Sequence, residues 1–246
     1  NCWAFDTPFQ QNAAQSRSEL YKAEKRRNVS RRMTDSQEEY LKMLDLELAF
    51  CTMREEEISR ISELTYRTNQ FNMSSLRKSK AEIGKLERNN IFTVKVKDKF
   101  GDYGISGGVI VEDRADSIYL ETFLLSCRVL GRNIEYAVVD CLKSLARERG
   151  KTAIEGKFVR SEKNEPMERF LSEICHMKED GSFRLSLDEG QKEIPYVKIR
   201  YQEDFQGMEC VEEISQGIGY HHVGIAVSDM DQMMDELKAF GYECEH

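Results

Sequence analysis

The spacing of hydrophobic residues changes along the chain from a helical to an alternating pattern. Apolar residues recur every three to four positions in 55–68 and 134–146, which places them on one face of a helix. They alternate with polar residues in 92–97, and the stretches 105–111 and 117–125 have the composition of strands. The pattern therefore predicts an α+β fold with a mixed, mostly antiparallel sheet flanked by helices.

Residues with specific roles at helix ends and turns sharpen this prediction. Ser36 and Ser79 are each followed three residues later by Glu, which predicts two helix starts with a capping box. Gly150 ends the helix that starts at Ile134, and Pro166 lies in the first turn of another helix. Residues 100–104 predict a hairpin turn. Further strands are predicted at 46–50, 151–158, 183–187 and 196–201.

The stretch 126–133 joins the predicted strand 117–125 to the helix that starts at Ile134. A strand followed by a glycine turn and a helix N-terminus presents unpaired backbone N–H groups to one spot. The helix dipole adds about half a positive charge there. The turn either binds a pyrophosphate or is an ordinary strand–helix connection. The binding residues would be Arg128, Val129, Gly131, Arg132 and Asn133, of which Asn133 tolerates unusual backbone angles.

Two residues beside this turn are candidates for catalysis. Cys127 lies next to Arg128 and near a helix N-terminus, both of which lower the pKa of a thiol. It is either a nucleophile or a small buried residue on a strand. Glu135 lies in the first helical turn, either as a catalytic base or because the helix dipole favours an acid there.

Amide side chains form a second group of candidates. Asn69, Gln70 and Asn72 follow the helix 55–68, and amides both donate and accept hydrogen bonds. They either bind a polar substrate or brace a loop. Asn164 has a similar choice, because it either hydrogen-bonds a ligand or caps the helix that follows it.

Composition excludes several classes of function. The net charge of −8 argues against a nucleic-acid-binding protein. No apolar run reaches the roughly 18 residues that a membrane span needs, and no signal peptide is evident. Seven scattered cysteines without a Cys-x-x-Cys pair favour a reducing cytoplasm over a disulfide framework or zinc ribbon. Because the chain starts without Met and ends just after a predicted helix, we expect it to be part of a longer protein.

Residues 15–32 form a predicted basic helix. This helix either docks an acidic partner such as an acyl carrier protein or is a solvated linker.

Residues 17 to about 177 resemble the C-terminal part of the FkbH-like family of the HAD superfamily. In that family a HAD-type phosphatase-like domain precedes a GNAT-like acyltransferase domain. The turn at Arg128 is similar to the Arg/Gln-x-x-Gly-x-Gly/Ala signature with which GNAT enzymes hold the pyrophosphate of coenzyme A. The resemblance rests on Arg17–Arg27, Arg60–Asn72, Phe100–Gly104, Ser126–Glu135 and Lys163–Pro166 with Phe170.

The resemblance implies a function in polyketide-like secondary-metabolite biosynthesis. Members of the family transfer a glyceryl group from a phosphorylated three-carbon donor to the phosphopantetheine thiol of an acyl carrier protein. It implies that coenzyme A or phosphopantetheine binds at the Arg128 turn. Asn69, Gln70, Asn72 and Asn164 would line the acyl end. An upstream HAD-like domain would be a further partner.

Two departures keep a second interpretation open. GNAT enzymes often carry a Tyr general acid on their last helix, but Leu171 occupies the matching position. Asp229-Met-Asp231 is the only Asp-x-Asp in the sequence and lies too near its end to be a HAD centre. The alternative is a non-catalytic docking module that positions a carrier protein for the upstream domain.

The end of the sequence resembles another family. His221-His222-Val-Gly-Ile-Ala-Val, followed by a helix, is similar to the opening βα unit of glyoxalase/VOC proteins such as methylmalonyl-coenzyme A epimerase. His222 would bind a divalent metal only in a complete module, because one His cannot hold the ion. The resemblances therefore predict four parts: the tail of an upstream HAD-like domain with a basic connecting helix (1–33), a GNAT-like acyltransferase domain (34–201), a linker (202–219) and the truncated start of a VOC domain (220–246).

Overall fold

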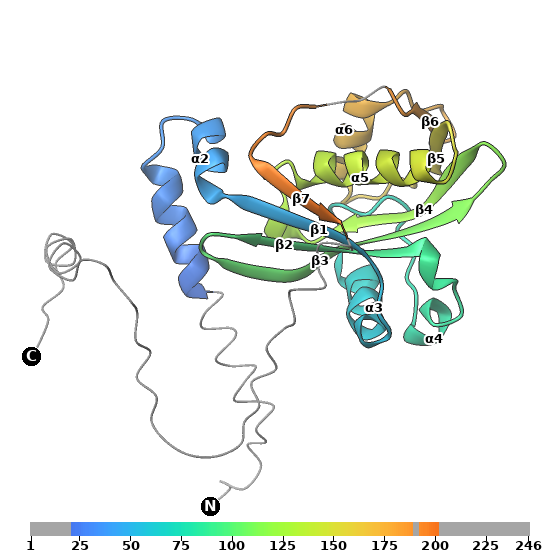
Figure 1. Cartoon of the computed structure of the whole chain (residues 1–246), viewed down its shortest axis with the longest axis horizontal. Helices are drawn as coiled ribbons and strands as arrows, with labels where there is room; N and C mark the ends of the chain where they lie inside the picture. Colours follow the sequence, from blue (N-terminus) through green and yellow to red (C-terminus); the bar gives the residue numbers. More distant parts are fainter. Residues whose placement is uncertain (1–20, 189–191, 202–246) are drawn as a thin grey trace, which may run out of the picture. The chain divides into compact units, whose positions relative to one another are not determined.

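A seven-stranded sheet forms the centre of the computed structural model, which describes residues 21–188 and 192–201 (Figure 1). The strand order is β6-β5-β4-β3-β2-β1-β7. Only the β4–β5 and β1–β7 pairs are parallel, which confirms the predicted mixed, mostly antiparallel sheet. The strands are β1 (Leu46–Thr52), β2 (Ile91–Asp98), β3 (Gly101–Asp113), β4 (Ser117–Leu125), β5 (Ala153–Lys157), β6 (Ser182–Ser186) and β7 (Val197–Tyr201).

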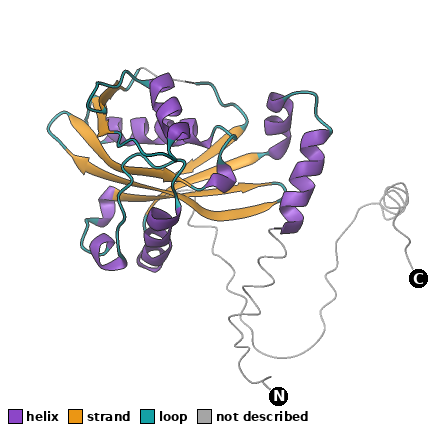
Figure 2. Cartoon of the chain, turned by 180° about the vertical axis from the view of Figure 1, so that it is seen from behind, coloured by secondary structure: helices purple, strands orange, loops and turns teal. Residues whose placement is uncertain are grey.

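Helices lie on both faces of the sheet, so the predicted α+β class is confirmed (Figures 1 and 2). Helices α5 and α6 cover one face, whereas α3 and α4 cover the other. Helix α2 precedes β1, and residues 21–32 are also helical. The bounds are α2 (Gln37–Leu44), α3 (Ile58–Arg67), α4 (Lys80–Ile83), α5 (Ile134–Glu148) and α6 (Glu165–Ile174), with short 3₁₀ turns at Glu55–Glu57, Arg88–Asn90 and Cys127–Val129.

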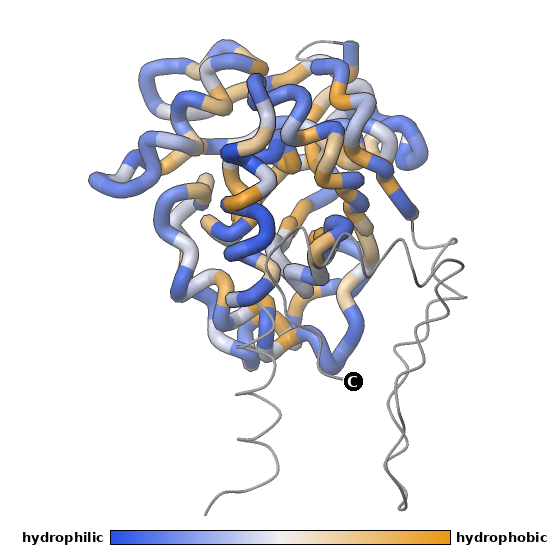
Figure 3. The backbone as a smooth tube through the Cα atoms, turned by 90° about the vertical axis from the view of Figure 1, so that its left-hand side faces the viewer, coloured by the Kyte–Doolittle hydropathy of each residue, from blue (hydrophilic) through white to orange (hydrophobic). Residues whose placement is uncertain are grey.

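The central strands are buried on both faces, because successive side chains point to opposite sides. In β3 and β4, Val109 and Phe123 belong to the large core beneath α5 and α6. Ile110 and Leu124 belong to a smaller core beneath α3 and α4. Hydrophilic residues gather in the outer loops (Figure 3). The sheet is therefore a rigid support from which loops project.

The predicted helix ends are confirmed. Ser36 accepts a hydrogen bond from Glu39 N, which is one half of the predicted capping box, whereas Ser79 forms the complete box. Gly150 follows α5 with a φ of +67°, a left-handed angle that favours glycine. Pro166 lies in the first turn of α6.

The hairpin turn between β2 and β3 lies earlier than predicted. Asp98 already pairs with Gly101, so only two residues connect the strands and residues 101–104 belong to β3. The Asp98 side chain closes this turn by accepting hydrogen bonds from Phe100 N and Gly101 N. A side-chain acceptor thus shortened the turn that the glycine pattern alone indicated.

A buried ion pair fastens the helix at residues 21–32 to this hairpin. Arg27 donates to both carboxylate oxygens of Asp98, at 2.7 and 2.9 Å. Tyr103 Oη donates to the same carboxylate at 2.7 Å, and the Arg27 guanidinium lies 4.0 Å from the centre of the Tyr103 ring. Burial alone would raise the pKa of Asp98, but the hydrogen bonds from Arg27 and Tyr103 outweigh it and lower that pKa.

The predicted linker 202–219, the VOC unit 220–246 and His222 lie outside the described residues. Within residues 21–188 and 192–201, no helix has the length and apolar character that a membrane crossing requires. In the same part of the chain, no three His, Cys, Asp or Glu side chains are placed to hold a metal ion.

Candidate functional site

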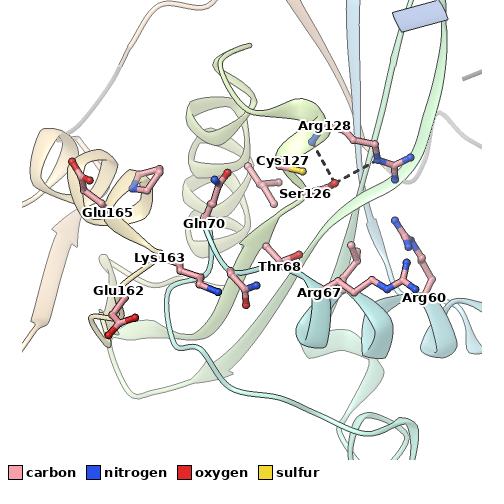
Figure 4. Close-up of a pocket in the computed structure, with 14 residues that line it drawn as sticks. Arg60, Arg67, Thr68, Gln70, Ser126, Cys127, Arg128, Glu162, Lys163 and Glu165 are labelled. Atoms are coloured by element: carbon pink, nitrogen blue, oxygen red, sulfur yellow. Dashed lines mark hydrogen bonds between the residues drawn. The ribbon is translucent and has the colours of Figure 1, made fainter. Parts of the chain in front are cut away.

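A cleft of about 840 Å³ lies where the end of β4 meets two loops (Figure 4). One loop follows α3 and the other connects β5 to α6. The cleft therefore brings together segments that are up to about 100 residues apart in the sequence. Its lining residues are Arg60, Leu64, Arg67, Thr68, Asn69, Gln70, Leu125, Ser126, Cys127, Arg128, Glu162, Lys163, Glu165 and Pro166.

Next to this cleft, the parallel strands β4 and β5 separate from one another. β4 pairs with β5 only as far as Leu120, opposite Gly156. Beyond that point Phe71 O accepts from Leu125 N, and Met73 N donates to Phe123 O, at 3.0 Å each. The segment 71–73 thus occupies the outer edge of β4 where β5 has left it. This edge of β4, next to the cleft, is therefore already filled by the chain's own backbone.

Two buried amides hold that segment in place. Asn72 donates to Thr68 O and accepts from Ser75 N. Asn164, whose side chain is buried, donates to Asn72 O and Val159 O and accepts from Ser161 N. Asn164 occupies the N-cap position of α6 without capping it through its side chain. Both amides therefore brace loops, and neither lines the cleft.

Helix α3 is positioned by contacts on its two sides. Its Ile61 packs where β3 carries Gly108, and a Cβ at Gly108 would lie only 3.1 Å from the Ile61 side chain. Buried Ser62 and Thr65 donate from their hydroxyls to Lys78 O. These contacts fix the helix close to the sheet, with its polar face toward the cleft.

Arg77 completes the loop that follows α3. It donates to Thr65 O and Thr68 O near the C-terminus of the helix, where a cation is favoured. It also donates to Asn69 Oδ1 at 2.5 Å. The side-chain oxygen of Asn69 therefore already accepts a hydrogen bond, and its side-chain nitrogen is the group left for a ligand. Asn69 and Gln70 both line the cleft. Of the four predicted amides, these two are the ones placed to contact a ligand.

Three guanidinium groups gather at one end of the cleft (Figure 4). Glu63 lies 2.7 Å from Arg60 and 2.8 Å from Arg67. The hydrogen bond from Arg60 lowers the pKa of Glu63, and the charges of Arg67 and Arg128 lower it further. Partial desolvation and the like charge of Arg60 lower the pKa of Arg128. One carboxylate thus faces three arginines, and this end of the cleft is positive.

The rest of the cleft is more mixed. Lys163 lies there beside Glu162 and Glu165. Cys127 lies between the two ends, exposed and free, in a 3₁₀ turn that follows β4. The interpretation of Cys127 as a buried strand residue is therefore wrong, because the strand ends at Leu125 and the turn carries the thiol outward.

The predicted pyrophosphate turn has the expected backbone. Gly131 and Asn133 adopt φ angles of +74° and +59°. The amide N–H groups of Gly131, Arg132 and Asn133 meet no acceptor among the described residues. Val129 is buried and anchors the turn in the core. Asn133 donates from its side chain to Tyr196 Oη.

The two arginines of the turn do not converge. Arg128 lines the cleft and contacts Ser126 Oγ at 3.5 Å. Arg132 does not line it; its guanidinium lies 5.2 Å from the centre of the Tyr103 ring and donates to Leu130 O. Only Arg128 is therefore positioned to act on a ligand in the cleft.

Glu135 also lies outside the lining of the cleft. One of its carboxylate oxygens is buried without a hydrogen-bond partner among the described residues. Burial raises the pKa of Glu135, against a smaller opposing effect of Lys192. Glu135 is thus a perturbed acid at the start of α5, but not one that faces Cys127 and Arg128 in the cleft.

Arg60, Arg67 and Lys163 are cleft residues that were not predicted as site residues. A signal for the first two was present in the sequence. Residues 60, 63 and 67 have spacings of three and four, which place Arg60, Glu63 and Arg67 on one helix face. Nothing in the spacing of Lys163 indicated that its loop would approach α3.

No family model matches the sequence, and no curated protein matches it. Solved structures that match include Ard1 from Thermoplasma volcanium, at 11% identity and a TM-score of 0.44 over 56% of this chain and 95% of that chain. The ribosomal-protein-S18-alanine N-acetyltransferase from Escherichia coli matches at 9% identity and a TM-score of 0.41, over 60% and 96% of the two chains. N-acetylglutamate synthase from Neisseria gonorrhoeae, complexed with coenzyme A and N-acetyl-glutamate, matches at 10% identity and a TM-score of 0.43. The match covers 59% of this chain and 35% of that chain. The fold class rests on the chain's own strand order and helix positions.

Proposed function

We propose that this chain is a GNAT-like acyltransferase domain that binds coenzyme A or a carrier-protein phosphopantetheine in the cleft. The observation that carries the proposal is the junction of the Cys127–Arg128 turn with the Asn69–Gln70 loop in one cationic cleft. The order β4, turn, α5, β5, α6 along the chain also fits the acyl-coenzyme A half of a GNAT fold.

The residues present fit the chemistry of such a ligand. Phosphate groups are recognised by arginine side chains and free backbone N–H groups. Arginine side chains line the cleft, and the turn at Gly131–Asn133, which lies outside its lining, would add the backbone N–H groups. The amides of Asn69 and Gln70 offer donors and acceptors for a pantetheine arm, which itself carries amide groups. A bound thioester would supply the activated acyl group.

The chain's own residues would bind and orient that thioester. The cationic end of the cleft would face the phosphates, while Gln70 and the free amide nitrogen of Asn69 would position the arm. The exposed Cys127 thiol lies within the same cleft and is the nucleophile candidate of the site.

The sequence resemblance supports a more specific function. The acyl group would be of the glyceryl type, and the acceptor would be the phosphopantetheine thiol of an acyl carrier protein in secondary-metabolite biosynthesis. An upstream HAD-like domain would act together with residues 34–201 in the cytoplasm.

A docking module without catalysis is the second candidate, and one observation favours it. Neither Tyr nor His lines the cleft within the described residues. Leu171, at the position of the family's general acid, is buried in the core. Such a module would hold pantetheine in the same cleft without protonating a leaving thiolate.

Thermal shift and turnover measurements test this proposal. The chain is mixed with coenzyme A, acetyl-coenzyme A or a phosphopantetheinylated carrier protein, beside a Gly131→Val variant. Valine is strained at a φ of +74°, so the turn should lose its binding geometry. Ligand at about 100 times its Kd should add about 2.7 kcal/mol to the wild type. Binding with turnover supports the transferase, binding without turnover supports the docking module, and no binding contradicts both.

A further inference from the structure

The three arginines near Glu63 carry more positive charge than its single carboxylate can neutralise. Arg60 and Arg67 share the Glu63 carboxylate, at 2.7 and 2.8 Å. Arg128 forms no ion pair among the described residues, and its side-chain partner is the Ser126 hydroxyl at 3.5 Å. Like charges at close range disfavour one another. The group therefore carries an excess of two positive charges at the end of an open cleft.

The Arg60 side chain and the backbone of Arg128 are also held in place before any ligand binds. The Arg60 side chain donates twice to Ile105 O in β3, at 3.3 Å each. Arg128 begins immediately after Ser126 and Cys127 at the end of β4, where the 3₁₀ turn fixes its backbone. Preorganised cations lose less entropy when an anion binds. The exposed Arg88, in contrast, is paired one to one with Glu55.

We propose that Arg60, Arg67 and Arg128 form a phosphate subsite on the α3 side of the cleft. The anion would lie between the guanidinium groups of Arg60 and Arg128, and Arg67 would balance its remaining charge. The inference rests on the proposed function for the identity of the ligand, but not for the existence of the subsite. Arg132 is not part of this subsite, because its guanidinium lies over the Tyr103 ring.

Glu63 has a definite role in this arrangement. In the absence of a ligand it holds Arg60 and Arg67 in position. It also competes with an incoming phosphate for the same cations. Removal of its negative charge should strengthen anion binding, whereas removal of an arginine should weaken it. A purely structural salt-bridge cluster would not respond to phosphate in either direction.

Isothermal titration with inorganic pyrophosphate at low ionic strength tests the subsite. Arg128→Gln and Arg60→Gln should each weaken binding by about tenfold or more, as expected for the loss of a charge-assisted hydrogen bond. Glu63→Gln should tighten binding. Arg88→Gln is the matched control, because it removes one exposed positive charge outside the cleft, and it should bind as the wild type does.

Two results would overturn the inference. The first is a wild type that does not bind pyrophosphate. The second is an equal loss of affinity in Arg88→Gln and Arg128→Gln, which would indicate only non-specific attraction. If Arg60→Gln unfolds the chain, the Arg128→Gln and Glu63→Gln pair alone still gives the opposite changes that the subsite requires.

Coenzyme A, dephospho-coenzyme A and 4′-phosphopantetheine identify the source of the phosphate. If Arg60→Gln weakens the binding of coenzyme A but not of dephospho-coenzyme A, the subsite binds the 3′-phosphate. If it weakens the binding of both ligands, the subsite binds a phosphate nearer the pantetheine arm. Failure of every pantetheine ligand, with pyrophosphate binding intact, would refute the proposed function and keep the subsite. Equal coenzyme A affinity in wild type and Arg128→Gln would refute the subsite and keep the proposed function.

Discussion

Two charged clusters of this chain differ in how their charges are matched. In the cluster around Asp98, one arginine meets one carboxylate, and Tyr103 completes the hydrogen bonds. Both charged side chains are buried, at 2% and 0% exposure. In the cluster around Glu63, a carboxylate that is 38% exposed pairs with Arg60 and Arg67, and the charge of Arg128 acts on it as well. The first cluster is saturated by the chain itself, and the second is not.

The difference separates a structural role from a binding role. A buried charge requires a partner, because desolvation of an unpaired ion is costly. The Arg27–Asp98 pair meets that requirement and fastens the helix at 21–32 to the hairpin. An exposed excess of positive charge costs little while water solvates it and becomes favourable when an anion arrives. We therefore expect substitutions in the two clusters to change different quantities.

The largest expected effect is on folding, at Asp98. Asp98→Asn leaves the buried Arg27 charge without its counter-ion and should reduce the free energy of unfolding by about 3–5 kcal/mol at neutral pH. The chemical-denaturation midpoint measures this. Because the pKa of Asp98 is lowered in the folded chain, its contribution is present above the ordinary carboxyl range of about pH 3.9 and is lost as the pH falls below it. The difference between wild type and variant should therefore shrink in acid.

A matched control for that prediction is Glu55→Gln, which removes one partner of the exposed Arg88–Glu55 pair. Its effect on unfolding should stay within about 0.5 kcal/mol. An Asp98→Asn variant as stable as this control would show that the buried pair contributes no more than a surface pair.

The next effect is on binding, at Arg128. Arg128→Gln should weaken coenzyme A binding by about tenfold or more while leaving the unfolding free energy within about 0.5 kcal/mol of wild type. Titration calorimetry and chemical denaturation of the same preparation measure the two quantities. A large loss of stability would place Arg128 with Arg27 as a structural residue and remove the contrast between the clusters.

A smaller effect is expected at Glu135, which belongs to neither cluster. Burial raises the pKa of Glu135, so the folded chain holds this proton more tightly than the unfolded chain does. Stability should therefore fall as the pH rises from about 4.3 through the raised folded pKa. Glu135→Gln removes this dependence and should gain on the order of 1 kcal/mol at neutral pH.

Denaturation at pH 4 and pH 8 checks the Glu135 prediction. The variant and wild type should be alike at pH 4 and differ at pH 8. A variant that is less stable at pH 8 would show that the ionised carboxylate has a favourable partner.

The smallest expected effect is at Arg132. Arg132→Gln should change coenzyme A affinity by less than about twofold, because its guanidinium lies over Tyr103 rather than in the cleft. Competition binding at fixed ionic strength has the precision to detect a difference of this size. A loss of coenzyme A affinity as large as that of Arg128→Gln would show that both arginines belong to one binding site.

Local sequence signals predicted most of the fold. Capping residues Ser36 and Ser79 fixed two helix starts, and the strand at 117–125 was predicted at its observed bounds. Such features depend on neighbours within a few residues. The strand at 196–201 was predicted, but its place in the sheet was not. β7 pairs in parallel with β1, about 150 residues away in sequence, at the edge opposite β6.

The site was predictable only in part. The left-handed angles of the turn followed from Gly131 and Asn133, which tolerate them. The directions of Arg128 and Arg132 depend on partners from distant strands and helices, namely Tyr103 and Arg60. Asn72 and Asn164 had two open roles, and the choice depended on backbone groups that folding brings to them.

The most direct test is a coenzyme A titration of wild type, Arg128→Gln and Arg132→Gln under one buffer condition. We predict that wild type and Arg132→Gln bind with similar affinity, and that Arg128→Gln binds about tenfold or more weakly. Equal affinity in all three proteins, or a larger loss in Arg132→Gln, would contradict a phosphate-binding cleft at Arg128.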